Sequence, residues 1–201
     1  MNLFLRAKIP LLTLLLSMTL LLVSFATLAY DLSFWESVQQ KNDVNATIAK
    51  PLNNAIHEYF FDANYKTTLA HEGLSQKEAE HMRDVKIRIN FVVLLALLCS
   101  FLSLFALIRV KKEERTIILV SSAIVIWVFP LLFFIIPFDP LFMKFHELFF
   151  KSGTFLFDAD ALLIRVYPQS FFNDFAMAIL QRTYLFGLGA LVIGFFVKKF
   201  K

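Results

Sequence analysis

Four long apolar runs constrain the fold of this 201-residue chain more than any other feature. They cover about residues 9–30, 87–108, 116–136 and 178–197. Each is close to the roughly 20 residues that a helix needs to cross a bilayer. The sequence is 58% hydrophobic, whereas soluble domains are roughly 45–50% apolar. We therefore expect an all-α integral membrane protein with four transmembrane helices.

The first run also has features of a secretory signal peptide. Arg6 and Lys8 precede it, and Thr27-Leu28-Ala29 is an acceptable cleavage site. Its apolar part is about 20 residues long, however, whereas the core of a signal peptide has roughly 7–15. This length favours a membrane anchor that is not cleaved.

Basic residues cluster beside the apolar runs and indicate an orientation. They are Arg6 and Lys8 before the first run, Arg109, Lys111, Lys112 and Arg115 between the second and third, and Lys198, Lys199 and Lys201 after the fourth. Four spans would put these clusters on one side, which the positive-inside rule makes cytoplasmic. Both termini are then cytoplasmic, and the connections 31–86 and 137–177 form an extracytoplasmic cap on a single membrane domain, 1–201. The net charge of +4 follows from this layout and does not indicate a nucleic-acid partner.

Shorter features of the chain also predict local structure. A helix is expected over 52–61, where Ile56, Tyr59 and Phe60 have helical spacing. In the third run, Pro130 should kink the helix and Pro137 should end it.

The most polar stretch, 75–88, continues without Gly or Pro into the second apolar run. Ser75 and Glu78 have the spacing of a capping box, which predicts a helix that begins here and enters the membrane. This helix carries His81, with Asp84 on the same face at i+3. A carboxylate there can orient an imidazole and stabilise its protonated form. The alternative is a solvated helix end with ordinary surface ion pairs.

A second histidine, His146, lies among phenylalanines in the other connection. In a helix, Phe142, Phe149 and Phe150 would surround it at i−4, i+3 and i+4. Such a helix would lie in the membrane interface with its aromatic face buried. Desolvation would lower the pKa of His146 and keep it neutral, as a general base requires. The alternative is a histidine at the end of an interfacial anchor.

Other candidate residues carry weaker signals. Asp158 and Asp160 could orient a histidine or bind a cation, or they could cap a loop and pair with Arg165. The single cysteine, Cys99, has no second thiol for a disulfide or a metal pair. The sequence contains no glycine-rich phosphate loop and no zincin or serine-hydrolase motif.

Two stretches taken together resemble the bacterial lipoprotein intramolecular transacylase family, Lit. They are His81-Met-Arg-Asp-Val-Lys86, followed by an apolar run, and Phe142-Met-Lys-Phe-His146-Glu-Leu-Phe-Phe150. Phe157-Asp158, Leu163-Ile164 and Pro168-Gln-Ser-Phe171-Phe172 follow in the order seen in the family. The chain departs from the family pattern at 154–162, where Lit proteins usually have a Trp before Phe-Asp and a longer loop with Asp-Pro.

The resemblance implies an acyltransferase of the bacterial cell membrane with four spans and an extracytoplasmic active site. Its substrates would be diacylated lipoproteins. The sn-2 acyl chain would move to the α-amino group of the N-terminal cysteine and leave a lyso-form lipoprotein. By motif, the catalytic residues would be His81 and His146, and Asp84 and Asp158 would support them. The acyl chains would contact a pocket formed by Phe142, Phe145, Phe149, Phe150, Phe157, Phe171 and Phe172. No metal or cofactor would be needed, and membrane lipid would be the other partner.

Two other functions remain open at the level of the sequence. In a metal-dependent membrane hydrolase, His81, Asp84, His146 and Asp158 would bind a divalent ion. In a non-catalytic membrane scaffold, the histidines would be incidental. His57 and His71 match no motif, and neither is assigned a function.

Overall fold

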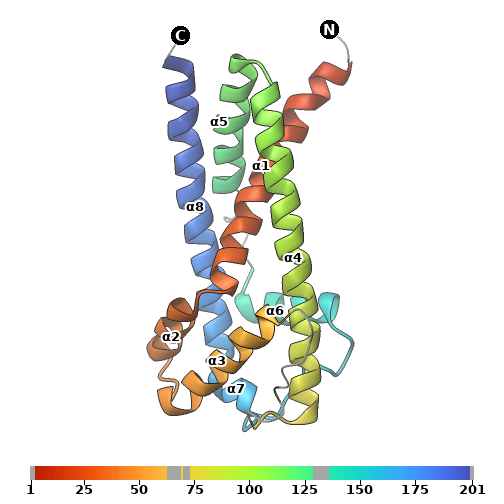
Figure 1. The fold of residues 1–201 in the computed structure, drawn as a ribbon, viewed down its shortest axis with the longest axis vertical. Helices are drawn as coiled ribbons and strands as arrows, with labels where there is room; N and C mark the ends of the chain where they lie inside the picture. Colours follow the sequence, from red (N-terminus) through yellow and green to blue (C-terminus); the bar gives the residue numbers. More distant parts are fainter. Residues whose placement is uncertain (1–2, 63–68, 70–72, 129–135, 200–201) are drawn as a thin grey trace. The chain divides into compact units, whose positions relative to one another are not determined.

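The computed structural model describes residues 3–62, 69, 73–128 and 136–199, with side chains from residue 7 onward (Figure 1). All regular elements of this part of the chain are helices. They fall into two compact units. Unit 1 comprises Met1–Thr27, Phe91–Ile136 and Ala178–Lys201, and unit 2 comprises Leu28–Asn90 and Pro137–Met177. Each unit has its own buried apolar cluster.

Unit 1 contains most of α1 (Leu3–Ala29), the second part of α4 (Gln76–Arg109), α5 (Lys112–Val128) and most of α8 (Gln169–Lys199). In the described chain, three helices are long and apolar enough to cross a membrane: α1 from Ala7 onward, α4 and α8. These three correspond to the first, second and fourth apolar runs. The third run begins in α5, which is described for 17 residues. Pro130 lies outside the described residues, so the expected kink there is untested.

Short polar side chains join the helices of unit 1. The hydroxyls of Thr19 and Ser103 are 2.9 Å apart and link α1 to α4. Ser122 donates to the carbonyl oxygen of Thr13 at 3.1 Å and links α5 to α1. Such small residues permit close helix approach in lipid, where no hydrophobic effect drives helices together. Outside these contacts the helices expose large apolar side chains, as expected for contact with lipid.

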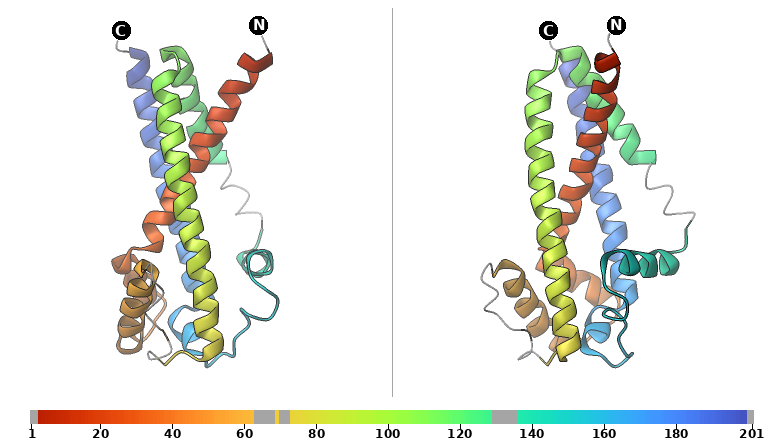
Figure 2. Two further views of the ribbon diagram at one scale, coloured as in Figure 1. Left: turned by 45° about the vertical axis from the view of Figure 1, so that its right-hand side comes forward. Right: turned by 90° about the vertical axis from the view of Figure 1, so that its right-hand side faces the viewer.

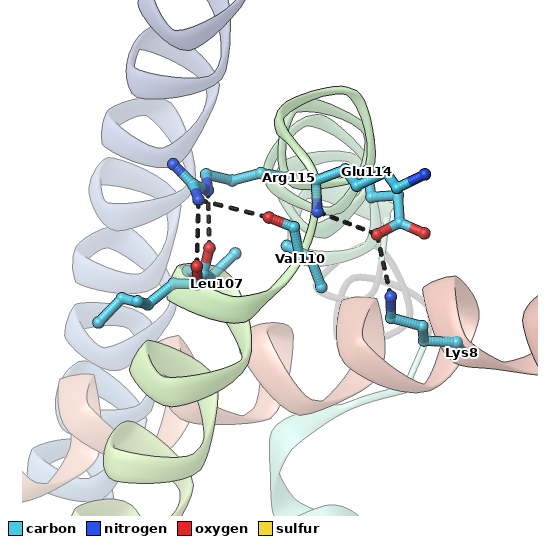
Figure 3. Close-up of polar contacts among 7 residues, drawn as sticks. Lys8, Leu107, Val110, Glu114 and Arg115 are labelled. Atoms are coloured by element: carbon cyan, nitrogen blue, oxygen red, sulfur yellow. Dashed lines mark hydrogen bonds and ion pairs between the residues drawn. The ribbon is translucent and has the colours of Figure 1, made fainter.

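The turn between α4 and α5 is fixed by two charged side chains (Figure 3). Arg115 donates to the carbonyl oxygens of Leu107 at 2.7 Å and Val110 at 3.4 Å, which satisfies acceptors at the C-terminal end of α4. Glu114 accepts from Lys8 of α1 at 2.9 Å. This ion pair places the first basic cluster of the sequence beside the second.

Unit 2 is built around the packed pair α2 (Leu32–Lys41) and α3 (Ala46–Phe61), with α7 (Leu162–Val166) against it. Gln39 and Asn53 are buried and exchange two hydrogen bonds at 3.0 and 2.7 Å. Tyr167, which follows α7, donates to Asn53 at 2.6 Å. Every member of this polar network has a partner, so its burial is tolerated.

The expectation of one continuous helix through the polar stretch and the second apolar run is confirmed. Helix α4 starts directly after Ser75, whose backbone N–H and hydroxyl both donate to Glu78, at 2.8 and 2.7 Å. The capping box is therefore formed. All charged residues of α4 except Arg109, in its last turn, lie within residues 76–88. This part of the helix belongs to unit 2. The uncharged apolar stretch starts at Ile89.

The first turns of α4 run between α3 on one side and α6 (Phe138–Phe149) on the other (Figure 2). Lys86 faces α3, because its Nζ donates to the carbonyl oxygen of Asp62 at 2.6 Å and lies 4.2 Å from the ring centre of Tyr59. The opposite side of α4 carries His81, which contacts aromatic rings of α6 and of the segment after it. This arrangement positions the candidate site.

Several boundaries differ from the sequence predictions. Helix α3 covers the expected 52–61 but begins at Ala46, because Asn45 caps it at 2.9 Å. Helix α8 begins at Gln169, well before the predicted span at 178, since Pro168 precedes a stretch without further helix breakers. Helices α2 and α7 were not predicted from the sequence, because they are short and contain few periodic apolar positions.

Candidate functional site

Two histidines from different parts of the chain face each other in unit 2. His81 lies in the second turn of α4, and His146 lies in the last turn of α6. Their ring centres are 6.3 Å apart, and the ring planes are inclined by only 21°. The fold thus brings together two residues that are 65 positions apart in the sequence, so that both imidazoles can contact one small group placed beside them.

The imidazole of His81 is enclosed by aromatic rings. The centres of Phe150 and Phe157 lie 4.8 and 5.4 Å from its own. The residue is 8% exposed, and its Nδ1 is buried and has no hydrogen-bond partner among the described residues. Burial, together with the charge of His146, lowers the pKa of His81 to about 4, against a smaller opposing effect of Asp84. His81 is therefore neutral at neutral pH.

The tautomer of His146 is fixed by the backbone of its own helix. Nδ1 lies 2.8 Å from the carbonyl oxygen of Phe142, which can only accept a hydrogen bond. In the neutral imidazole Nδ1 therefore carries the proton, and Nε2 carries the free lone pair. Desolvation lowers the pKa of His146, while the hydrogen bond to Phe142 opposes the shift. A neutral imidazole with an available Nε2 is the form that a general base requires.

Asp84 lies beside His81 on α4 but does not hydrogen-bond to it within the described structure. Its Oδ1 is instead 3.9 Å from Nη1 of Arg88, one turn further along. Its influence on His81 is electrostatic, and it raises the pKa of the imidazole. The expected supporting function of Asp84 therefore stays a prediction, with charge as its physical basis.

Asp158 and Asp160 are exposed and line a different hollow. This hollow of about 580 Å³ is also bordered by Glu78, Leu162 and Arg165. Asp158 follows Phe157, whose ring contacts His81. The carboxylate of Asp158 itself contacts neither histidine in the described structure. No group of three histidine, cysteine or acidic side chains in the described residues is arranged to bind a metal ion.

The seven phenylalanines of the expected pocket divide into three groups. Phe142, Phe145 and Phe150 contact the ring of His146, at centre distances of 4.3, 5.6 and 5.4 Å. Phe157 contacts His81, and Phe172 reaches the site through Phe142 at 5.3 Å. Phe149 packs on Phe145 at 4.8 Å and is largely exposed, whereas Phe171 is buried in the core of unit 2. Phe155, which was not predicted, lies 5.2 Å from His146.

The remaining histidines do not join this group. His57 packs between Trp35 and Phe61, and its Nε2 is 3.2 Å from the carbonyl oxygen of Tyr30. Trp35 is a core residue of unit 2, whereas Phe61 is exposed, so His57 lies at the edge of that core. His71 lies outside the described residues.

Sequence reasoning missed two cations of α4 that contact the segment after α6. Arg88 donates to the carbonyl oxygen of Phe149, and Lys77 donates to that of Leu156. Lys77, His81, Asp84 and Arg88 recur at helical spacing on one face of α4. That periodicity was visible in the sequence, but the backbone carbonyls that the cations bind leave no sequence signal.

Comparisons with known proteins identify the family. The family model of the lipoprotein intramolecular transacylase Lit matches residues 4–172. A solved structure of the membrane-integral lipoprotein intramolecular transacylase Lit from Bacillus cereus superposes with a TM-score of 0.79 at 19% identity, covering 96% of this chain and 97% of that one. A variant of the same protein with one histidine replaced by arginine superposes with a TM-score of 0.74 at 21% identity, covering 98% and 94%.

At these identities the structural matches show a shared fold. No curated protein sequence matches the chain. The family model, by contrast, extends over most of the sequence and includes both His81 and His146. The chain therefore belongs to the lipoprotein intramolecular transacylase family, Lit, whose members are acyltransferases.

Proposed function

We propose that this protein is a lipoprotein intramolecular transacylase that moves the sn-2 acyl chain of an S-diacylglyceryl cysteine to the α-amino group of the same cysteine. The product is a lyso-form lipoprotein. Family membership supports the reaction class. The observation that carries the chemistry is the pair of facing neutral imidazoles, His81 and His146, within a shell of phenylalanine rings.

The reaction requires proton transfers that such a pair can supply. The substrate ammonium must lose a proton, so that the amine nitrogen can attack the ester carbonyl carbon. As the new C–N bond forms, the nitrogen loses a second proton and the ester C–O bond breaks. The departing glyceryl oxygen takes up one proton, so one proton is released to solvent overall. Donor and acceptor belong to one molecule, so the enzyme has to orient a ring closure and move protons, without supplying a nucleophile.

We assign His146 as the base and His81 as the acid. Nε2 of His146 has a free lone pair that can accept the amine proton, because Nδ1 is engaged with Phe142. Neutral His81 would first receive the proton that His146 takes from the substrate nitrogen, and the resulting imidazolium would then donate that proton to the departing glyceryl oxygen. Positioned acid–base catalysis of this kind contributes roughly 10²–10⁴-fold to a rate. The surrounding rings would exclude water and contact the acyl chains.

We further propose that four helices span the bacterial cell membrane, with unit 2 as the extracytoplasmic cap and both termini in the cytoplasm. Three candidate spans and the shared fold of a membrane-integral relative support this topology. The ion pair of Lys8 with Glu114 also supports it, because it keeps the basic ends of α1 and of the α4–α5 turn together.

Mass spectrometry of a reporter lipoprotein tests the function. Purified protein in lipid should convert the N-terminal diacylglyceryl cysteine to the N-acylated lyso form, without a change in the total number of acyl chains. His81→Ala and His146→Ala should each lower the rate by roughly 100-fold or more. Arg83→Gln is the matched control, because Arg83 is exposed on the same helix. If both histidine variants retain the wild-type rate, the proposed mechanism is wrong.

The same assay separates the transacylase from a metal-dependent hydrolase. A chelator should leave the rate unchanged, because the chemistry proposed here uses only imidazole groups. Loss of activity on chelation, with release of free fatty acid instead of the lyso lipoprotein, would support the hydrolase.

A further inference from the structure

We infer that Lys77 and Arg88 are positioning residues that hold the segment after α6 against α4, and thereby keep His146 in register with His81. The inference rests on the proposed function only for its consequence in catalysis. Its structural content, that two cations fix the distance between two imidazoles, can be tested without any turnover.

The spacing of the two cations suits this function. Lys77 and Arg88 are 11 positions apart, three helical turns, and therefore lie on one face of α4 about 16 Å apart along its axis. His81 and Asp84 lie between them on the same face. The cations thus flank the imidazole that the segment after α6 has to cover.

Arg88 attaches the C-terminal end of α6 to α4. Its Nε donates to the carbonyl oxygen of Phe149, the last residue of α6, and Nη1 donates to the carbonyl oxygen of Asp84 at 2.8 Å. The guanidinium also lies 4.6 Å from the ring centre of Phe150. Carbonyls in the last turn of a helix lack intrahelical partners, and a cation there is favoured by the helix dipole. His146 is in that last turn.

Lys77 attaches the other end of the segment. Its Nζ donates to the carbonyl oxygen of Leu156 and lies 5.2 Å from the ring centre of Phe157. Phe157 is one of the two rings that enclose His81. Each cation therefore binds a backbone carbonyl and contacts the ring of the next residue. Those two rings, of Phe150 and Phe157, both contact His81.

The backbone between these two attachments makes local contacts. The N–H and the hydroxyl of Thr154 both donate to the carbonyl oxygen of Lys151, at 3.1 and 2.8 Å, and Gly153 adopts a φ of +82° in this turn. These bonds shape the turn but do not attach it to α4. Alignment of the segment with α4 then depends on Arg88 and Lys77 together with the ring packing.

A cross-linking experiment measures the distance between the histidine positions directly. The variants His81→Cys and His146→Cys are combined in a Cys99→Ala background, and the full-length protein in lipid is treated with a short thiol-specific linker. Arg88→Gln, Arg88→Lys and Lys77→Gln are each added to this background. The controls are Arg83→Gln, on another face of α4, and Lys77→Arg, which keeps a donor at that position.

We expect Arg88→Gln and Lys77→Gln to lower the initial cross-linking rate roughly tenfold, the change expected when a hydrogen bond from a charged group is lost. Arg88→Lys should also lower it, because an ammonium cannot direct two planar donors to two carbonyls. Arg83→Gln and Lys77→Arg should retain the parent rate. A cross-linking rate unchanged by Arg88→Gln and Arg88→Lys overturns the function of Arg88, and one unchanged by Lys77→Gln overturns that of Lys77.

A melting temperature of each variant identifies a general loss of folding, and Arg88→Lys provides the milder replacement if Arg88→Gln fails to fold. In the histidine-containing protein, the same substitutions should lower kcat of lipoprotein conversion more than they raise KM. If the wild-type protein makes no lyso lipoprotein while the cross-linking results hold, the proposed function fails and the positioning function stands.

Discussion

The pKa of each of the two histidines is lowered, and burial is the main cause in both. His81 is enclosed by Phe150 and Phe157, and His146 is half-buried among the rings of α6. Neither has a carboxylate within hydrogen-bonding distance in the described structure, the usual device for raising the pKa of a histidine. The site is therefore built to keep both imidazoles neutral and ready to accept a proton.

This neutrality predicts a pH dependence of stability. An unfolded histidine protonates near pH 6.5, whereas folded His81 does so only near pH 4. Between these values the unfolded chain binds the extra proton, so the free energy of unfolding should fall as the pH drops from 6.5 towards 4. Above pH 6.5 the contribution of His81 is complete and constant.

Thermal unfolding in detergent between pH 7.5 and 4.5 measures this effect. His81→Gln should flatten the pH dependence relative to the wild type, because glutamine does not titrate. Arg83→Gln should retain the wild-type slope. Parallel pH curves for wild type and His81→Gln would contradict the lowered pKa. The difference between the curves matters, since other carboxylates titrate in both proteins.

At the scale of elements, the start of α4 is secured by a buried carboxylate. Glu78 is 3% exposed, and it accepts from the N–H and hydroxyl of Ser75 and from the N–H of Leu163 in α7, at 2.8, 2.7 and 2.8 Å. The capping box was readable in the sequence, because it is local. The bond to Leu163 spans 85 positions and could not be read there.

Glu78→Gln should therefore cost more than an ordinary cap substitution. It removes charge-assisted bonds to three donors, and we expect a loss of about 1–3 kcal/mol in the free energy of unfolding. Ser75→Ala should cost about 1 kcal/mol, since it removes only the cap side chain. Glu80→Gln, an exposed neighbour, should stay within about 0.5 kcal/mol of wild type. Denaturant unfolding in detergent gives these values, and equal stabilities for Glu78→Gln and Glu80→Gln would refute the argument.

Helix α6 has two apolar faces. One carries Phe142 and His146, and the other exposes Phe145, Leu148 and Phe149, with Leu148 at 76%. Lys144 and Glu147 form an exposed ion pair at 2.6 Å. An amphipathic helix with an exposed aromatic face is typical of one that lies in the membrane interface. The helix expected around His146 from its aromatic spacing is formed and covers Phe138–Phe149.

Tryptophan replacements test whether that face contacts lipid. In vesicles, Leu148→Trp should fluoresce at shorter wavelength than in the control Lys144→Trp, and brominated acyl chains should quench it more strongly. The reason is that position 148 would lie among acyl chains, whereas position 144 would face water. Equal emission and equal quenching at the two positions would contradict an interfacial α6.

At the scale of the whole molecule, the sequence predicted an all-helical membrane protein because composition and run length depend on the bilayer itself. The family pattern also singled out His81 and His146, whose catalytic function stays a prediction. It did not predict α2, α7 or the early start of α8, since these depend on contacts such as Tyr167 with Asn53 and Lys41 with Asp174, at 2.6 Å each. The parallel stacking of His81 on His146 likewise depends on distant segments meeting.

The orientation of the chain in the membrane can be tested by labelling cysteines on either side of it. Single cysteines are introduced in a Cys99→Ala background at two charged positions. Glu80→Cys is at an exposed position in unit 2, and Lys112→Cys is at a half-buried position at the start of α5. The positive-inside rule puts Lys112, next to Arg109 and Lys111, in the cytoplasm. Helix α4 is continuous from Gln76 to Arg109 and its apolar stretch starts at Ile89, so Glu80 should lie on the other side.

A membrane-impermeant maleimide should therefore label Glu80→Cys on intact bacterial cells, and Lys112→Cys only after the cells are opened. Labelling of this kind would place His81 and His146 on the extracytoplasmic side, as the proposed reaction on membrane-anchored lipoproteins requires. If only Lys112→Cys were labelled on intact cells, the orientation of the chain would be the opposite of the one proposed. The two histidines would then face the cytoplasm, and the proposed extracytoplasmic active site would be wrong.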